Sequence, residues 1–257
     1  VKAGTIRLLV APDRDDDSRG IRARAALVAE EDFLAATLGG VELDSVSAGR
    51  NLAVASLRNG VSMNRAEAGE TLQIVADRIY LADGDRWHAG GDIHLGTAPP
   101  RSDGLGRFSN WGAIVAGRDL VLALSAFETP FNHGTLSAGR DVLGMAPRIA
   151  TVVPDPDGGP PVTHYSNPDV SFKLLPLLQA EASEQARQLL RTLGDTVRGQ
   201  AFINNSGTDF PHGGLIEAGR DVHLAYFKNH DRGRIVAAND IHFWSIPNPG
   251  YLSPGLA

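Results

Sequence analysis

The chain has 257 residues, a formal net charge of −6 and no cysteine. Disulfides, thiolate metal sites and cysteine nucleophiles are therefore excluded. The acidic balance, without a basic block, argues against nucleic acid or an anionic membrane as the main partner. No apolar run approaches the ~20 residues of a membrane span, so we predict neither a nucleic-acid partner nor a membrane span.

The first elements are a strand over residues 1–10 and an acidic loop over residues 11–20. The strand lacks the layout of a secretion signal, and no initiator methionine precedes it, so we expect a piece of a longer protein. The loop carries four aspartates between residues 13 and 17. It fits either a cation-binding loop or a plain exposed loop, because Arg14 and Arg19 interrupt the alternating carboxylates that calcium prefers.

The stretch 21–38 is rich in Ala, Leu, Glu and Arg, which favours a helix on propensity alone. However, Glu30 precedes Gly49 by 19 residues, in register with the repeats that follow, and Phe33 takes the place of Leu52. We therefore predict a degenerate coil of a repeat fold, and leave helical character open at Arg22–Leu27.

A phrase of the form Ala-Gly-Arg-Asp-apolar recurs along the rest of the chain, most clearly at Ala116–Leu120 and Ala138–Val142. Its second position falls at residues 30, 49, 69, 90, 117, 139, 219 and 238, so the steps are 19, 20, 21, 27, 22, 80 and 19. After each phrase the apolar residues alternate, as at Leu120 and Leu122. Period two predicts a strand with one buried face.

The phrase itself predicts a corner between two strands. Alanine is small enough to point inward at a bend, glycine can take a positive φ there, and aspartate can hydrogen-bond the local backbone. Arginine followed by aspartate fits either a ligand ladder or, as we expect, turn stabilisation and charge compensation, since a bare column of aspartates would repel itself. The predicted corner residues are Gly49, Gly69, Gly90, Gly117, Arg118, Asp119, Gly139, Arg140, Asp141, Gly219, Arg220 and Asp221.

A unit of about twenty residues with two or three short strands cannot bury its apolar face alone, but stacked units can. We predict an all-β fold, a right-handed parallel β-helix, with coils over residues 1–145 and 213–245. Nine coils at about 4.8 Å each would give a rod roughly 40 Å long. A propeller would need repeats of ~40 residues, and an antiparallel sandwich would need more tight hairpin turns than Asn59-Gly60.

The step of 80 residues marks an insertion over residues 146–212. Its first part is proline-rich and predicted to be irregular, and its second part predicts an amphipathic helix at about 172–199, whose stripe either covers the β-helix or projects from it. Loops are expected at Thr97–Phe108 and Phe127–His133, and residues 246–257 read as a proline-rich cap or junction. The candidate partner-binding residues are Phe127, Phe131, Leu175, Leu178, Leu189 and Leu193.

His94, His223 and His242 occupy equivalent positions, just after the first apolar residue of a strand, and are expected to face outward. The last two would stack about 5 Å apart, as a metal pair or as ordinary surface. No cluster of carboxylates stands out. We therefore assign no catalytic residue, no metal ligand and no cofactor, and predict that the chain is not an enzyme.

The phrases at Gly112–Leu122, Gly134–Val142 and Gly214–Leu224 resemble the haemagglutinin-repeat shaft of filamentous-haemagglutinin-like exoproteins, the secreted partners of two-partner secretion in Gram-negative bacteria. The resemblance covers about 39–145 and 213–245. It implies a right-handed β-helix, export to the cell surface through an outer-membrane secretion partner, and adhesion to a protein or glycan of a host or neighbouring cell. The family's amino-terminal secretion domain is not visible in the sequence. Because β-helices also include polysaccharide lyases and hydrolases, a polysaccharide-active enzyme remains the alternative.

Overall fold

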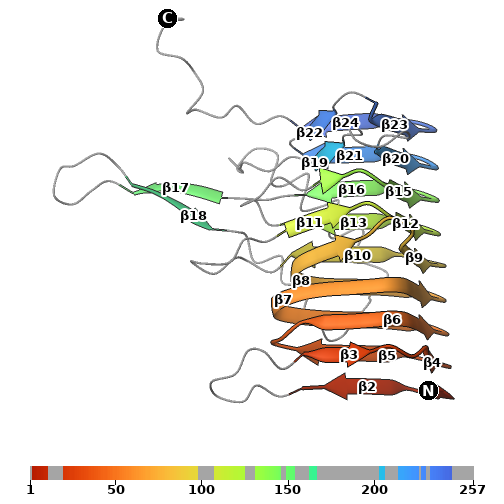
Figure 1. Cartoon of the computed structure of the whole chain (residues 1–257). Coiled ribbons are helices and arrows are strands. Elements are labelled where there is room, and N and C mark those ends of the chain that lie inside the picture. The colour runs from red at the N-terminus through yellow and green to blue at the C-terminus, as the bar shows by residue number, and fades with distance from the viewer. Residues whose placement is uncertain are drawn as a thin grey trace, which may run out of the picture.

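The computed structural model describes residues 2–10, 20–97, 107–124, 131–145, 149–153, 162–166, 203–205, 214–225, 227–229 and 232–244. Within them every regular element is a strand, and all but two strands belong to one large, almost wholly parallel sheet. This sheet winds around a common axis, with the N-terminal coil at one end and β24 (Ile241–Trp244) at the other (Figure 1). The all-β, parallel β-helix prediction is therefore confirmed.

Each coil contributes strands to three ladders, which we call faces A, B and C in chain order. Face A contains β1 (Lys2–Ala3), β4 (Leu27–Ala29), the end of β6 (Val41–Ala48), the end of β7 (Asn51–Ala68), β9 (Arg86–Ala89), β12 (Ala113–Ala116), β15 (Thr135–Ala138), β20 (Leu215–Ala218) and β23 (Arg234–Ala237). Face B contains β2 (Ile6–Leu9), β5 (Phe33–Thr37), the starts of β7 and β8 (Thr71–Leu81), β10 (Ile93–Thr97), β13 (Leu120–Ala123), β16 (Val142–Met145), β21 (Val222–Ala225) and β24.

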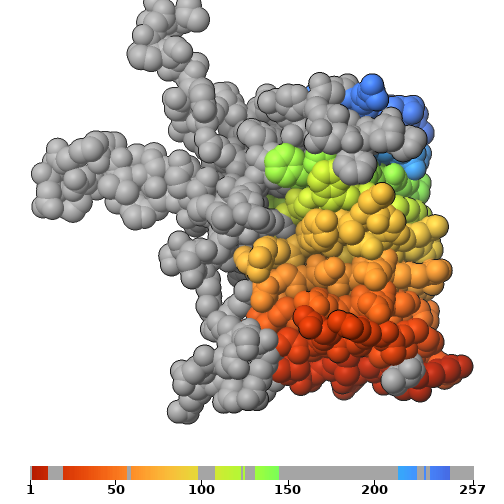
Figure 2. Space-filling view, in the orientation of Figure 1, coloured from red at the N-terminus to blue at the C-terminus, as the bar shows by residue number. Residues whose placement is uncertain are grey.

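Face C contains β3 (Ile21–Ala23), the start of β6, the middle of β7, the end of β8, β11 (Arg107–Asn110), β14 (Phe131–Asn132), β19 (Ile203–Asn205) and β22 (Phe227–Asn229). Nine strands thus stack on face A and nine on face B, which at about 4.8 Å per coil gives a rod of roughly 40 Å. Figure 2 shows the coils as successive bands from red to blue along this axis.

The register of each ladder is set by apolar residues that repeat at the same place in each coil. On face B, Ile93 pairs with Leu72 on one side and Leu120 on the other, and all three side chains are fully buried. Because side chains alternate along a strand, a shift of one residue would turn this whole column outward. The hydrophobic core is therefore continuous from Ile6 in the first coil to Leu224 near the other end.

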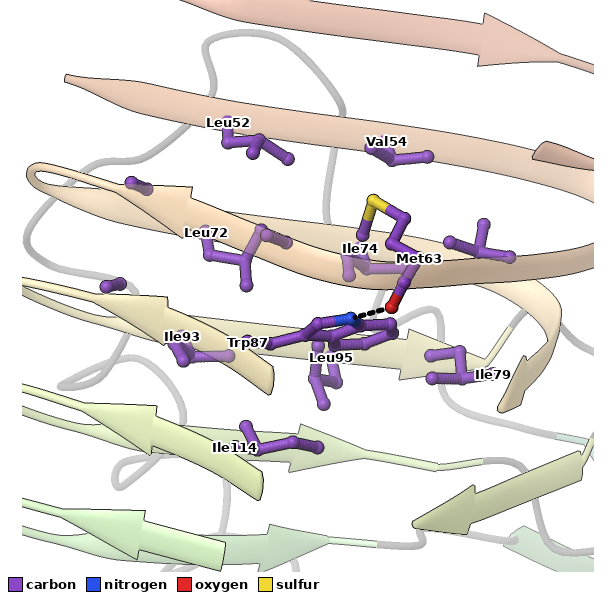
Figure 3. Packing of buried hydrophobic residues seen from close by; sticks show 14 of the residues in the cluster. Leu52, Val54, Met63, Leu72, Ile74, Ile79, Trp87, Ile93, Leu95 and Ile114 are labelled. Atoms are coloured by element: carbon purple, nitrogen blue, oxygen red, sulfur yellow. Dashed lines mark hydrogen bonds between the residues drawn. The ribbon is translucent and has the colours of Figure 1, made fainter. Parts of the chain in front are cut away.

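Trp87 on face A is the largest fully buried side chain of this core. Its indole Nε1 donates a hydrogen bond to the backbone carbonyl of Met63, at 2.8 Å, so the polar group of the ring is satisfied inside the coil. Figure 3 shows this bond beside Leu95 and below the column of Leu52 and Leu72. This one aromatic ring thus joins face A to the Met63 backbone of face C inside the core.

The stretch 21–38 forms three strands, β3, β4 and β5, joined by short turns, so the helical character considered at Arg22–Leu27 is wrong. β3 pairs with the start of β6 and β4 pairs with its end, leaving only a short corner at residues 24–26 between them. The helix-favouring composition is overridden because each strand gains a ladder partner and a buried apolar residue, Ile21 and Leu27.

The insertion lies between two coils that pair directly with one another. β15 pairs with β20, and β16 pairs with β21, although about 80 residues of chain separate the partners. Within the part expected to be irregular, β17 (Ile149–Val153) and β18 (Val162–Ser166) form an antiparallel hairpin (Figure 1). β19 lies inside the predicted insertion but pairs with β14 and β22, so it belongs to face C.

Five predicted features lie wholly or partly outside the described residues. They are most of the acidic loop, the amphipathic helix at about 172–199, the loop residues 98–106 and 127–130, and the proline-rich segment 246–257.

Candidate functional site

The repeated phrase forms the turn between face A and face B. Its alanine is buried in the core, as Ala89 and Ala116 are. The glycine is needed for a different reason than the positive φ expected, since Gly84 is the one described glycine with a positive φ. A Cβ at these turn glycines would lie 2.0–2.3 Å from a carbonyl oxygen of the preceding coil, which holds for Gly49, Gly69, Gly90, Gly117, Gly139 and Gly219.

The arginine and aspartate of the turn form a ladder between coils. Arg118 donates from Nε to Asp92 Oδ1 at 2.9 Å, and the backbone N–H of Asp119 donates to the same oxygen at 3.1 Å. Arg140 donates to Asp119 in the same way through Nε at 2.6 Å, and Arg220 donates to Asp141 at 2.8 Å. In each pair Nη2 contacts the second carboxylate oxygen, so the pairs are bidentate.

Each aspartate of this ladder therefore stabilises the next coil rather than its own turn. The Asp119 and Asp141 side chains are fully buried, whereas the arginines that cover them are 37% and 46% exposed. The pKa of Arg140 is raised, chiefly because its side chain hydrogen-bonds Asp119. In an earlier part of the ladder, Asp32 accepts hydrogen bonds from Arg50 and Asn51. The ladder is interrupted after Arg50, because Glu70 and Thr71 take the arginine and aspartate positions of the next turn and Gly91 takes the arginine position of the one after it.

His94 faces outward as expected, but it is buried there, so the three histidines do not share one environment. His94 alternates with core residues Ile93 and Leu95 and so lies on the outer side of face B, yet it is only 2% exposed. Gln73 and Val121, its partners in the neighbouring coils, are buried as well. Burial lowers the pKa of His94, although the charges of Asp92 and Asp119 act in the opposite direction.

His223 and His242 stack on face B as expected, with ring centroids 4.6 Å apart and planes 8° from parallel. In the part of the chain that the structure describes, no group of three or more His, Asp or Glu side chains is arranged to hold a metal ion.

The predicted loops and most of the insertion connect strands of face B to strands of face C, at what we call the B–C corner. The connections there are residues 10–20, 38–40, 98–106, 124–130, the 57 residues 146–202, and the single residue 226, while β7 and β8 pass the corner without a break. By contrast, the turn from face A to face B has three residues in every coil from β9 onward. Variation in length is therefore concentrated at the B–C corner, with a further connection, 206–214, between faces C and A.

Among the candidate partner-binding residues, the structure describes only Phe131. Phe127, Leu175, Leu178, Leu189 and Leu193 lie outside the described residues. Phe131 is 38% exposed on β14, where it was expected in a loop, while Phe108 at the end of the other predicted loop is buried in β11.

Phe131 belongs to a group of aromatic side chains that we call the face C aromatic cluster, made of Tyr80, Trp111, Phe131 and His133. The rings of Phe131 and His133 lie 5.8 Å apart and within 9° of parallel, and Trp111 stacks on His133 at 4.0 Å. Tyr80, Ser109 and Phe131 follow one another in the same column of face C. Tyr80 and Trp111 could not be identified from the sequence, because only the face C register, which the repeats do not display, places them beside Phe131 and His133.

The buried carboxylates of the described residues, and the partly buried Asp85, serve structural purposes. Asp92, Asp119 and Asp141 accept hydrogen bonds from arginines, and Asp85 accepts one from the backbone N–H of Ala82 at 2.7 Å. Burial raises the pKa of Asp85. Each of these acids therefore closes a turn or joins two coils.

Comparison with known proteins found no match among family models, curated proteins or solved structures. Among the described residues there is also no helix able to span a membrane. The architecture and the side-chain contacts described above are thus the observations from which a function can be argued.

Proposed function

We propose that this chain is a structural and adhesive shaft segment of a large secreted bacterial surface protein, similar to filamentous haemagglutinin. The observation that carries the proposal is the contrast between a regular rod and connections of variable length at the B–C corner. Such a rod holds a row of loops at fixed spacing, which is what a surface-presenting scaffold requires. In this proposal the coils wind right-handed, and the chain contributes no catalytic residue, metal ligand or cofactor site.

The partners in this proposal are a protein or glycan on a host or neighbouring cell, and an outer-membrane secretion partner for the parent protein. The absence of cysteine suits a chain that crosses the outer membrane unfolded and then folds by stacking. Each coil pairs with its neighbours through three ladders, so folding can start at one coil and proceed to the next. The location that follows is the bacterial cell surface.

The alternative, a polysaccharide-active β-helix enzyme, needs two carboxylates held at a catalytic separation in a site open to substrate. The ladder aspartates are buried under arginines, so they do not favour it.

The test is adhesion of the purified segment to host cells and to neighbouring bacteria, with and without the inserted chain. Residues 149–200 are replaced by a short linker while β19 is kept, because residue 226 alone spans the same corner between β21 and β22. We expect the intact segment to adhere and the deletion variant to lose most of that adhesion. Equal adhesion by both would assign recognition to the coils, and no adhesion by either would contradict the adhesive function.

A further inference from the structure

Exposed large hydrophobic side chains occur at three places in the described structure. Leu9 lies in the first coil, and Val236, Ile241 and Phe243 lie in the last, where one side of each coil has no described neighbour. Tyr80 and Phe131 are different, because they are 49% and 38% exposed in the middle of the rod, where coils pack on both sides. The ends of the stack do not account for these two rings.

Tyr80 and Phe131 lie in the same column of face C, with Ser109 between them. Two coil spacings place their backbones about 9.6 Å apart along the rod. Ser109 is the small member of the column, and its Oγ accepts a hydrogen bond from Trp111 Nε1 at 3.0 Å. The two exposed rings therefore stand on either side of a hydroxyl group whose position is fixed by an indole.

The orientation of the neighbouring rings is fixed as well. His133 lies between Trp111 and Phe131 in the cluster, with planes 19° and 9° from parallel to them. The backbone N–H of His133 donates to the carbonyl of Asn110, so the stack is joined to the ladder below it. A surface of rings held in this way loses little conformational entropy when a ligand binds.

A polar turn borders the cluster. The turn 82–85 lies against Trp111 and Gly112, because Trp111 N–H donates to the carbonyl of Leu81 and a Cβ at Gly112 would lie 2.3 Å from the carbonyl of Asp85. Asp83 is exposed at the tip of this turn. The cluster thus combines apolar ring faces with the hydroxyl groups of Tyr80 and Ser109, beside a turn that carries the exposed Asp83.

We propose that the face C aromatic cluster binds an uncharged oligosaccharide. The C–H faces of sugar rings pack against aromatic rings, while sugar hydroxyls exchange hydrogen bonds with hydroxyl and carboxylate groups. The inference rests on the proposed adhesive function only for the origin of the ligand, a cell-surface glycan; the binding site itself is defined by the described residues.

Two other classes of ligand fit less well. A stable protein interface buries about 800 Å² on each partner, far more than these four side chains can offer. Single-stranded nucleic acid also stacks on aromatic rings, but it requires a cationic groove along its backbone. Here Asp83 borders the cluster, and Arg78 is already engaged by Asn59 and lies 4.0 Å from Asp77.

The experiment measures binding of uncharged and acidic oligosaccharides to the purified segment by calorimetry, beside Tyr80→Ala, Phe131→Ala and the double variant. Each single change should weaken binding of the uncharged ligand about two- to tenfold, and the double change more than tenfold. Phe243→Ala is the matched control, because it removes an equally exposed ring in the last coil on face B. Trp111→Phe keeps a ring but loses the bond to Ser109, and should weaken binding without changing the circular dichroism spectrum.

Three outcomes would overturn the inference. Binding is unchanged in the double variant, it is confined to acidic glycans, or it is absent for every sugar in the panel. Cell adhesion measured in parallel separates this outcome from failure of the proposed function. A segment that adheres to cells but binds none of the sugars keeps the adhesive function and loses the glycan site. A segment that binds sugar through the cluster but adheres to no cell keeps the site and loses the adhesive function.

Discussion

A carbonyl oxygen of the neighbouring coil occupies the space beside each turn glycine. This contact explains why glycine recurs at the turn from face A to face B although its φ there is ordinary. Where the repeat drifts to Ala238, the turn lies in the last described coil. The turn glycine is therefore required because a side chain there would clash with the backbone of the neighbouring coil.

The first prediction concerns Gly117. Its Cβ in a Gly117→Ala variant would lie 2.1 Å from the carbonyl oxygen of Gly90, so backbone must shift in two coils. We expect a loss of about 1–3 kcal/mol in the free energy of unfolding, measured by urea denaturation. Gly4→Ala is the control, since nothing lies within 4 Å of its added methyl group; equal losses in both variants would contradict the contact.

The second prediction concerns pH and His94. Its pKa in the folded protein is lowered from 6.5 by burial, so below about pH 6.5 the unfolded chain binds a proton that the folded chain does not. Stability is therefore complete above pH 6.5 and falls as the pH drops below it, by up to about 1.4 kcal/mol between pH 7.5 and 5.5. His94→Gln should flatten this part of the stability–pH curve; an unchanged curve in His94→Gln would count against the assignment.

Single residues differ in how well the sequence predicts their placement and burial. The inward alanine follows from size alone and is confirmed at Ala89 and Ala116. The burial of His94 does not follow, because strand alternation distinguishes the core side from the outer side but says nothing about what covers the outer side. Gln73, also on that outer side, is likewise buried.

Successive turns are connected by the arginine–aspartate ladder. Because Asp119 is fully buried, its charge is tolerated only with Arg140 and the N–H of Asp141 as partners. The ladder thus adds directional, charged hydrogen bonds to a stack otherwise held by ladders of backbone bonds and by apolar burial.

The third prediction is that Arg140→Ala costs about 1.5–3 kcal/mol of unfolding free energy, since it leaves a buried carboxylate without its charged partner. Arg65→Ala serves as the control, because Arg65 pairs with Glu67 on the surface, where such pairs are worth at most about 1 kcal/mol. Both can be compared by chemical denaturation at neutral pH. The interpretation fails if the two substitutions cost the same.

Among the elements, the strands of face B could be predicted from the sequence, and so could the early face C strands that alternate apolar residues, such as Ile79 and Leu81 at the end of β8. The face C strands of the later coils could not. Face B strands follow the phrase directly and alternate apolar residues, as β13 does. On face C, β14 has two residues and places Asn132 inward, where its Oδ1 accepts a hydrogen bond from Asn110 of the coil below at 2.8 Å. An inward amide ladder removes the apolar period on which strand prediction depends.

The whole rod is specified by register on three faces, so partners need not be close in sequence. β16 and β21 pair as closely across the insertion as β13 and β16 pair without one. A longer connection costs little, because loop-closure entropy rises only slowly with length.

The fourth prediction follows for the variant in which a short linker replaces residues 149–200. Its β-rich circular dichroism and its urea midpoint should stay close to those of the intact chain. Extending the deletion to residue 205 removes β19 from between β14 and β22, and should lower the midpoint clearly. Equal midpoints for the two deletions would show that β19 contributes nothing to the stack.

The B–C corner has a consequence for how such a chain can change over generations. Codons added or lost there alter only what the corner displays, because every ladder partner on the three faces stays in place. A lineage under pressure to change its recognition properties can therefore exchange whole segments at this corner while inheriting an unaltered rod. The same corner is the natural place to graft a foreign peptide for display, at a height along the rod chosen by the coil that carries it.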